Sequence, residues 1–156
     1  MIQYLLDTNI CVFYLRGQLR LDEFVKGKWR EHCCISEVTV LELYFGAENS
    51  PFSFARFAIS TVLELYFGAE NSNYPCKHYE AVSTFLQDVS VFPISTCALV
   101  YAKEKTRFRK AGTPVNDEFD LIIASSAIAG GLTLVTDNVK HFKDFENIKI
   151  ENWFRN

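Results

Sequence analysis

The sequence predicts an α/β protein in which helices cover a parallel β-sheet. Two observations lead to this prediction. Short apolar runs typical of buried strands alternate along the chain with longer segments of helical spacing, and such an alternation is typical of a parallel sheet. The chain also has 156 residues, of which 49% are hydrophobic, which is enough for one domain with its own core. We therefore expect a single domain over residues 1–156.

The N-terminal part contains two apolar runs of strand length. The first runs from Ile2 to Leu6 and ends at the polar triplet DTN, and a helix is expected from about Ile10. The second runs from His32 to Ser36, and a helix is expected from Val38. Each run is followed by polar residues that suit the end of a strand and the start of a helix.

The C-terminal part continues the same alternation. Apolar runs again have strand length, and the segments between them have helical spacing. The expected elements, in order, are a helix over Tyr79–Asp88, a strand at Val89–Ile94, helices over Leu99–Lys110 and Asp117–Ala129, a strand at Leu132–Thr136 and a short strand near Ile148–Glu151.

Composition excludes several classes of protein. No apolar run approaches the roughly 20 residues of a membrane span, and Asp7 interrupts the N-terminus before a signal-peptide core could form, so we expect a cytoplasmic protein without a membrane partner. Five cysteines show neither an even count nor CxxC spacing, which favours reduced, buried thiols over disulfides or zinc. The net charge of −3 argues against binding nucleic acid through a broad basic surface.

One segment occurs twice without a single difference. The sequence TVLELYFGAENS runs from Thr39 to Ser50 and again from Thr61 to Ser72. A solenoid would repeat more often and diverge between copies, so we interpret residues 51–72 as a duplicated insertion that adds one helix. Either copy could occupy the native helix position, and the intact connection ISEVT favours the first. Glu42 is therefore preferred over its counterpart Glu64.

Four acidic residues stand where the local pattern changes: Asp7, Glu42, Asp120 and Asp137. Two of them follow apolar strands, and ligand sites in α/β sheets form outside the carboxyl ends of the strands. Carboxylates gathered there would repel one another unless a hard cation such as Mg²⁺ held them together. The pattern therefore raises the hypothesis of a metal site.

Three of the four acidic residues also have a structural interpretation. Asp7 can cap the following helix, Asp117 with Asp120 resembles a capping box, and Asp137 with Asn138 can form a turn. Spacing alone does not decide between these interpretations. Sequence patterns for other chemistry are absent, since the three histidines lack HExxH spacing and neither a phosphate loop nor a GxSxG elbow occurs.

Basic residues concentrate in the segment from Tyr101 to Gly112. Lys103, Arg107 and Arg109 could contact the phosphates of a nucleic acid. The alternative is a solvated helix face, which is common for charged helical segments.

The order of these blocks resembles the PIN-domain nucleases, and specifically the VapC-type toxins. The matching blocks are LLDTN, ISEVTVLELYFGAENS, GTPVNDEFDLIIASSA, LTLVTDNVKHF and IENW. The resemblance spans nearly the whole chain, and its specificity lies in the combination and order of the blocks. It implies a three-layer α/β/α sandwich and an endoribonuclease that depends on Mg²⁺ or Mn²⁺. It also implies a cognate VapB-type antitoxin, a homodimer and an RNA substrate such as tRNA.

By the same resemblance, Asp7, Glu42 and Asp120 match the first three acidic positions of the family. Asp7 and Asp120 are expected to bind the metal, with Glu42 and either Asp137 or Asn138 completing the site. The substrate-binding residues implied are Asn9, Lys103, Arg107 and Arg109, and the alternates are Glu64, Asp117 and Asn138.

Two alternatives stay open at this point. An aspartate and a threonine after a strand also open haloacid-dehalogenase-type phosphatases, although Asn9 stands where their second aspartate is required. The duplication could also leave a folded protein that binds a partner chain or an antitoxin without cleaving RNA.

Overall fold

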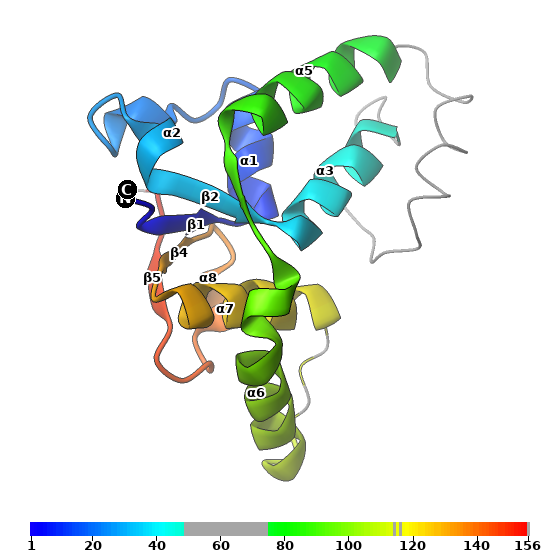
Figure 1. Ribbon diagram of the computed structural model, residues 1–156, viewed down its shortest axis with the longest axis vertical. Helices are drawn as coiled ribbons and strands as arrows, with labels where there is room; N and C mark the ends of the chain where they lie inside the picture. The colour runs from blue at the N-terminus through cyan, green and yellow to red at the C-terminus, as the bar shows by residue number, and fades with distance from the viewer. Residues whose placement is uncertain (49–74, 114, 116, 156) are drawn as a thin grey trace.

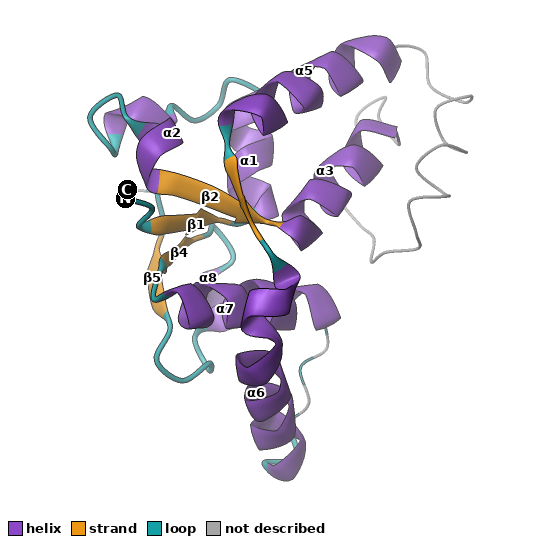
Figure 2. Ribbon diagram, viewed as in Figure 1, coloured by secondary structure: helices purple, strands orange, loops and turns teal. Residues whose placement is uncertain are grey.

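The computed structural model describes residues 1–48, 75–113, 115 and 117–155, and shows a five-stranded parallel sheet between two layers of helices (Figures 1 and 2). The strands are β1 (Tyr4–Leu6), β2 (Cys33–Ser36), β3 (Ser90–Phe92), β4 (Thr133–Val135) and β5 (Lys149–Glu151). The α-helices are α1 (Thr8–Leu15), α2 (Trp29–His32), α3 (Glu37–Glu48), α5 (Pro75–Asp88), α6 (Ala98–Lys110), α7 (Glu118–Gly130) and α8 (Val139–Phe142), and the 3-10 helices are η1 (Leu21–Glu23) and η3 (Ile94–Cys97).

The strand order places the polar segments that follow β1 and β4 side by side. The sheet has the order β3-β2-β1-β4-β5, and every neighbouring pair is parallel. Leu6 at the end of β1 pairs with Val135 at the end of β4. Because the chain runs from β1 to β3 on one side and then continues with β4 on the other, the strand order reverses between β1 and β4. Ligands of open α/β sheets bind at such a switch point.

Alternating side chains of the strands fill two separate cores. Leu6, Ile35 and Val135 belong to the core shared with α1, α3 and α5, whereas Leu5 and Leu134 belong to the core shared with α6, α7 and α8. All five are fully buried, as expected when both faces of a parallel sheet are covered. Figure 1 shows α1, α3 and α5 on one side of the sheet and α6 and α7 on the other.

Outside the insertion, the expected elements are all present, with ends shifted by a few residues. The largest shift is at α5, which begins at Pro75 rather than Tyr79, because proline is well suited to the first turn of a helix. The single-turn helices α2 and α8 were not expected, since four residues are too few to establish a helical period.

The cysteines agree with the expectation of reduced, buried thiols. Cys11, Cys33, Cys34 and Cys97 are free and buried, and burial raises the pKa of Cys33 and of Cys34 to about 12.

The insertion over residues 51–72 and its Glu64 lie outside the described residues. No helix in the described part of the chain is long and apolar enough to span a membrane.

Candidate active site

The candidate site lies where β1 and β4 end. Asp7 directly follows β1 and Thr136 directly follows β4, and the backbone N–H of Asp7 donates to the carbonyl oxygen of Val135 at 3.0 Å. The two strands thus hold both side chains at the switch point of the sheet. Sequence separation between these residues is large, so only the parallel pairing brings them together.

Asp7 is the most buried of the acidic residues, with 5% of its surface exposed. One carboxylate oxygen accepts from the backbone N–H of Thr8 at 2.8 Å, so Asp7 does cap α1. The other oxygen accepts from the Asn9 amide at 2.7 Å and from the Thr136 hydroxyl at 2.6 Å. The structural and the functional interpretation of Asp7 are therefore compatible, because capping uses only one of its two oxygens.

Glu42 approaches this site from α3. The helix follows β2 directly, and its start is fixed by Ser36, whose hydroxyl accepts from the backbone N–H of Thr39 at 3.0 Å. One turn further on, the Glu42 carboxylate accepts a short hydrogen bond from the hydroxyl of Thr8. Thr8 therefore joins the start of α1 to the carboxylate of α3.

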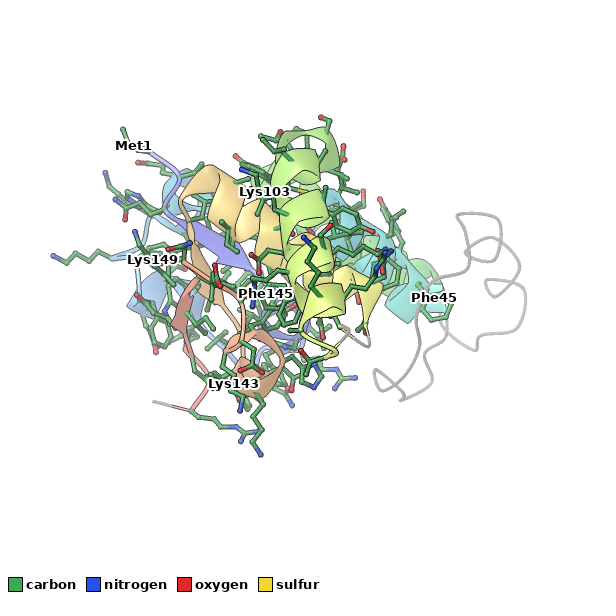
Figure 3. The ribbon with its side chains drawn as sticks, turned by 90° about the horizontal axis from the view of Figure 1, so that it is seen from below. Met1, Phe45, Lys103, Lys143, Phe145 and Lys149 are labelled. Atoms are coloured by element: carbon green, nitrogen blue, oxygen red, sulfur yellow. The ribbon has the colours of Figure 1, made fainter. Side chains whose placement is uncertain are left out.

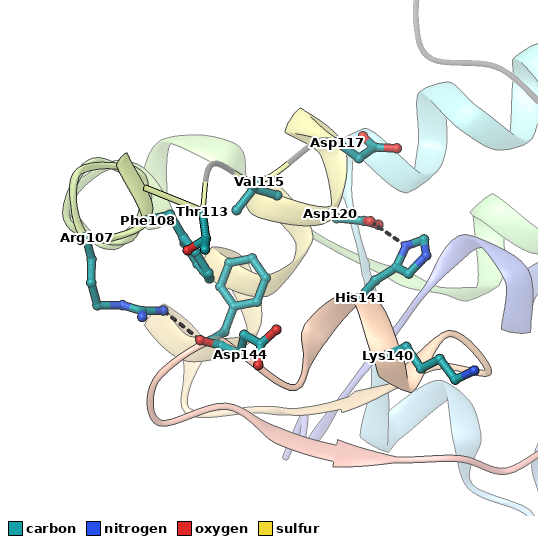
Figure 4. A pocket seen from close by; sticks show the side chains of 10 residues that line it. Arg107, Phe108, Thr113, Val115, Asp117, Asp120, Lys140, His141 and Asp144 are labelled. Carbon is teal, nitrogen blue, oxygen red and sulfur yellow. Dashed lines mark hydrogen bonds and ion pairs between the residues drawn. The ribbon is translucent and has the colours of Figure 1, made fainter. Parts of the chain in front are cut away.

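Asp120 approaches from the first turn of α7. Asp117 caps this helix by accepting from the backbone N–H of Phe119 at 2.8 Å, which confirms the structural interpretation of Asp117. Asp120 is hydrogen-bonded to Nδ1 of His141 on α8, at 2.8 Å, and the pair is visible in Figure 4. His141 thus belongs to the site although its sequence context gave no sign of it.

The fourth acidic residue is held by the C-terminal segment. Asp137 accepts from the Asn152 amide at 3.0 Å and from the guanidinium of Arg155 at 2.7 and 2.9 Å. Its backbone N–H donates to the side chain of Asn9 at 3.2 Å. The structure thus places Asp137 next to Asn9 but turns its carboxylate toward residues 152–155. Asn138 is the N-cap residue of α8, and its backbone N–H donates to the Thr136 hydroxyl at 2.9 Å.

Burial and neighbouring carboxylates raise the proton affinity of the three remaining acidic residues. Burial raises the pKa of Asp7 to about 6, and the charge of Asp120 adds to this effect. Burial raises the pKa of Glu42 to about 7, and the charges of Asp7, Asp117 and Asp120 act in the same direction. Burial and the nearby Asp117 also raise the pKa of Asp120, against the lowering effect of His141. The site therefore gathers negative charge that its surroundings do not fully compensate.

The donor chemistry of this site fits a divalent cation. Carboxylate oxygens are the ligands that hard cations such as Mg²⁺ prefer, and a bound cation would relieve the repulsion that raises these pKa values. Within the described residues, the side-chain conformations do not bring three acidic, histidine or cysteine groups together around one point. Binding of an ion by all three carboxylates therefore requires a side-chain movement.

The basic residues predicted to contact RNA lie on α6, which carries Lys103 on the side of the molecule seen in Figure 3. Lys103 and Arg109 are exposed. Arg107 differs, because its guanidinium binds the largely buried Glu104 at 2.6 Å and the backbone oxygen of Asp144 at 2.8 Å. Arg107 therefore ties α6 to the segment after α8, while Lys103 and Arg109 remain open to a ligand.

Reasoning from the sequence missed the polar residues that orient the acidic ones. These residues lack a motif because each acts through a contact made only in the folded chain. They are Thr8, Thr136, His141, Asn152 and Arg155. Of these, Thr8 and Thr136 adjoin predicted site residues, which is the one signal that could have identified them.

Comparison with known proteins places the chain among related sequences and structures. The PIN domain family matches residues 4–148. The "tRNA(fMet)-specific endonuclease VapC" of Salmonella typhimurium is 27% identical, with 98% of this chain and 99% of the relative covered. "Ribonuclease VapC2" of Rickettsia felis is 30% identical, with 96% and 97% covered. The crystal structure of DNA-bound VapBC from Salmonella typhimurium matches with a TM-score of 0.74 and 26% identity, over 98% of this chain and 99% of that one.

Proposed function

The chain belongs to the PIN-domain family, and from this membership we propose that it is a divalent-metal-dependent endoribonuclease toxin of the VapC type. The relatives named as VapC ribonucleases cover nearly its whole length, and their names support RNA as the substrate. The solved VapBC complexes support a VapB-type antitoxin that neutralises it. Membership of the PIN-domain family replaces the alternative of a haloacid-dehalogenase-type phosphatase.

The observation that carries this proposal is the buried carboxylate of Asp7 at the switch point of the sheet. It is 5% exposed, it is bonded to neutral donors, and two further carboxylates raise the proton affinity of the same site. A purely structural role would not require three acidic groups so near one another that their charges interact, because unpaired buried charge is costly. A role in binding a cation accounts for all three.

We assign Asp7 and Asp120 to metal binding, with Glu42 completing the negative charge. A divalent ion held there would supply a water nucleophile at neutral pH and would neutralise charge on the phosphate. Thr136 and Asn9 fix the orientation of Asp7, and Thr8 fixes that of Glu42. Asp137 acts differently, since its bonds to Asn152 and Arg155 hold the segment after β4 against the C-terminus.

Several finer assignments belong to the same proposal. The ion is Mg²⁺ or Mn²⁺, in keeping with oxygen ligands. Lys103 and Arg109 contact the phosphates that flank the cleaved bond, and Asn9 also binds the substrate.

A structured RNA such as tRNA is the substrate, as the name of the Salmonella relative suggests. The toxin is a homodimer that acts in the cytoplasm, where RNA is available. One domain carries the site, and residues 51–72 form an insertion within it.

The test uses purified, antitoxin-free protein and total RNA. We expect cleavage with Mg²⁺ or Mn²⁺, no cleavage with a chelator, and at least a hundredfold slower cleavage by Asp7→Asn. Asp22→Asn is a suitable control, because it makes the same change in η1, outside the site. Circular dichroism shows whether each variant is folded. A folded wild-type protein that leaves RNA intact under all of these conditions would contradict the proposal.

A further inference from the structure

A pocket of about 670 Å³ lies beside Asp120, between α6, α8 and the segment that precedes α7 (Figure 4). Its size falls within the range of roughly 300 to 1,000 Å³ that is usual for small-molecule sites. Asp120 and His141 form one wall, so the pocket adjoins the candidate active site at Asp120, whereas Asp7 and Glu42 do not line it. A group that fills the pocket would lie next to Asp120.

The opposite wall is aromatic, and the Arg107 guanidinium carbon lies 4.2 Å from the centroid of the Phe108 ring. The rings of Phe108 and Phe145 pack edge to face, with their centroids 4.9 Å apart, and both residues are largely buried. Thr113 and Val115 close the pocket above them. Unpaired bases of RNA commonly pack against aromatic side chains of this kind, since every base has a flat face.

Asp144 supplies a hydrogen-bond acceptor inside the pocket. Its backbone oxygen is held by Arg107 at 2.8 Å, which fixes the position of the residue. Its side chain turns away from Arg107 and into the pocket in Figure 4. Within the described residues, no donor is bonded to the Asp144 carboxylate. A base that presents N–H groups would find its acceptor there.

The charges of the lining favour a neutral group inside and a phosphate outside. Three carboxylates, those of Asp117, Asp120 and Asp144, face three basic side chains, those of Arg107, Lys140 and His141. Arg107 already binds Glu104. Lys140 is exposed and has no ion-pair partner within the described residues. A free phosphate would therefore be attracted to Lys140 rather than drawn to the aromatic wall.

We infer that this pocket binds one unpaired nucleotide of the RNA, next to the cleaved bond, with its base against Phe145 and the Arg107 guanidinium that covers Phe108, and with its N–H edge on Asp144. This inference rests on the proposed ribonuclease function and adds a determinant of sequence preference to it. Guanine is the base that suits the pocket best, because its adjacent N1–H and N2–H groups can both donate to one carboxylate. Uracil, with a single N–H donor, suits it least.

The test measures binding of the four ribonucleoside 5′-monophosphates, which an endoribonuclease cannot cut. Each is titrated into Mg²⁺-loaded, ¹⁵N-labelled protein, and amide shifts are followed by NMR. We expect GMP to bind about tenfold more tightly than UMP, with shifts at Thr113, Val115 and Phe145. Asp144→Asn should remove the preference, and Val115→Trp should abolish binding by filling the pocket. Asp22→Asn should behave as wild type.

A second probe separates RNA from a protein partner as the occupant. A short arginine-containing peptide is titrated in the same way, because the carboxylates of the pocket could instead accept a cationic side chain. Shifts of the pocket amides with this peptide, but with no nucleotide, would assign the pocket to a protein and overturn the inference. Equal binding of all four nucleotides in wild type and Asp144→Asn would overturn it as well.

Cleavage assays on the same preparations keep the two proposals apart. Selective GMP binding without RNA cleavage would retain the pocket and reject the nuclease. Metal-dependent cleavage, with the bases flanking the cut unchanged in Asp144→Asn, would retain the nuclease and reject the pocket as a determinant of sequence preference.

Discussion

At the scale of single residues, hydroxyl and imidazole groups hold the candidate carboxylates in place. Thr8 donates to Glu42, Thr136 donates to Asp7, and His141 is bonded to Asp120. Each acidic residue therefore has one polar partner from another part of the chain. Orientation of metal ligands by such partners commonly affects activity by about 10- to 100-fold. Substitution of a partner should therefore slow RNA cleavage even though the acidic residue itself is unchanged.

Thr8 provides the first test. We expect Thr8→Val to reduce kcat/KM for RNA cleavage by about tenfold, because the nearly isosteric side chain cannot donate to Glu42. Thr8→Ser keeps the hydroxyl and should stay within about threefold of wild type. Steady-state kinetics on one RNA give both values. Equal activity of the valine and serine variants would show that the contact with Glu42 does not matter.

His141 provides the second test. We expect His141→Ala to lower kcat/KM by about tenfold, because Asp120 loses the group that orients it. The amide nitrogen of His141→Asn can occupy the place of Nδ1 and should restore most of the activity. Mn²⁺ titration followed by electron paramagnetic resonance shows whether metal affinity changes in parallel. A fully active alanine variant would exclude this role of His141.

At the scale of elements, α6 is fastened to the segment after α8 by one side chain. Arg107 is 30% exposed and reaches Glu104, Glu146 and the backbone of Asp144. Removal of Arg107 would leave the buried carboxylate of Glu104 without its partner, which is more costly than loss of an exposed ion pair. The same segment carries Phe145, so this contact also shapes the proposed nucleotide pocket.

The stability of two α6 variants measures this contact. We expect Arg107→Ala to lower the free energy of unfolding by on the order of 1 to 3 kcal/mol. Lys103→Ala, on the same helix but exposed, should change it by less than about 0.5 kcal/mol and should instead weaken RNA binding. Urea denaturation monitored by circular dichroism gives both values. An Arg107→Ala protein as stable as Lys103→Ala would refute the structural role.

Prediction from sequence succeeded for elements and was less complete for the site. The run Leu132–Thr136, which contains β4, is a short apolar segment between turns, and this pattern is local. The contact between Asp120 and His141 instead depends on how α7 packs against α8, which no local pattern encodes. Asp137 shows the same limit, because its partner Arg155 becomes its neighbour only when the C-terminal segment returns past β5.

At the scale of the whole molecule, the buried carboxylates couple stability to pH and to metal. The pKa of Asp7 is raised to about 6 and that of Glu42 to about 7. The folded, metal-free protein therefore retains protons that the unfolded chain releases above about pH 4. By linkage, the free energy of unfolding falls as pH rises between about pH 4 and 7. The stability that the protonated Asp7 and Glu42 contribute is fully lost above pH 7.

Thermal unfolding of wild type and Asp7→Asn isolates the contribution of one carboxylate. We expect wild type to lose stability relative to Asp7→Asn, by on the order of 2 kcal/mol, as pH rises from 4 to 8 without metal. Mn²⁺ at pH 8 should restore wild type but stabilise Asp7→Asn much less, because a ligand that binds only the folded state stabilises it. Parallel pH profiles of the two proteins would contradict the assignment of Asp7.

The most direct test of the central claim is the metal-dependent rate of RNA cleavage by five single variants measured side by side. We expect Asp7→Asn, Glu42→Gln and Asp120→Asn each to lose at least a hundredfold. Asp137→Asn should lose less than tenfold, since Asp137 faces the C-terminal segment, and Glu64→Gln should cleave at the wild-type rate. Cleavage at the wild-type rate by Asp7→Asn, in a folded protein, would contradict the claim that these carboxylates form the active site.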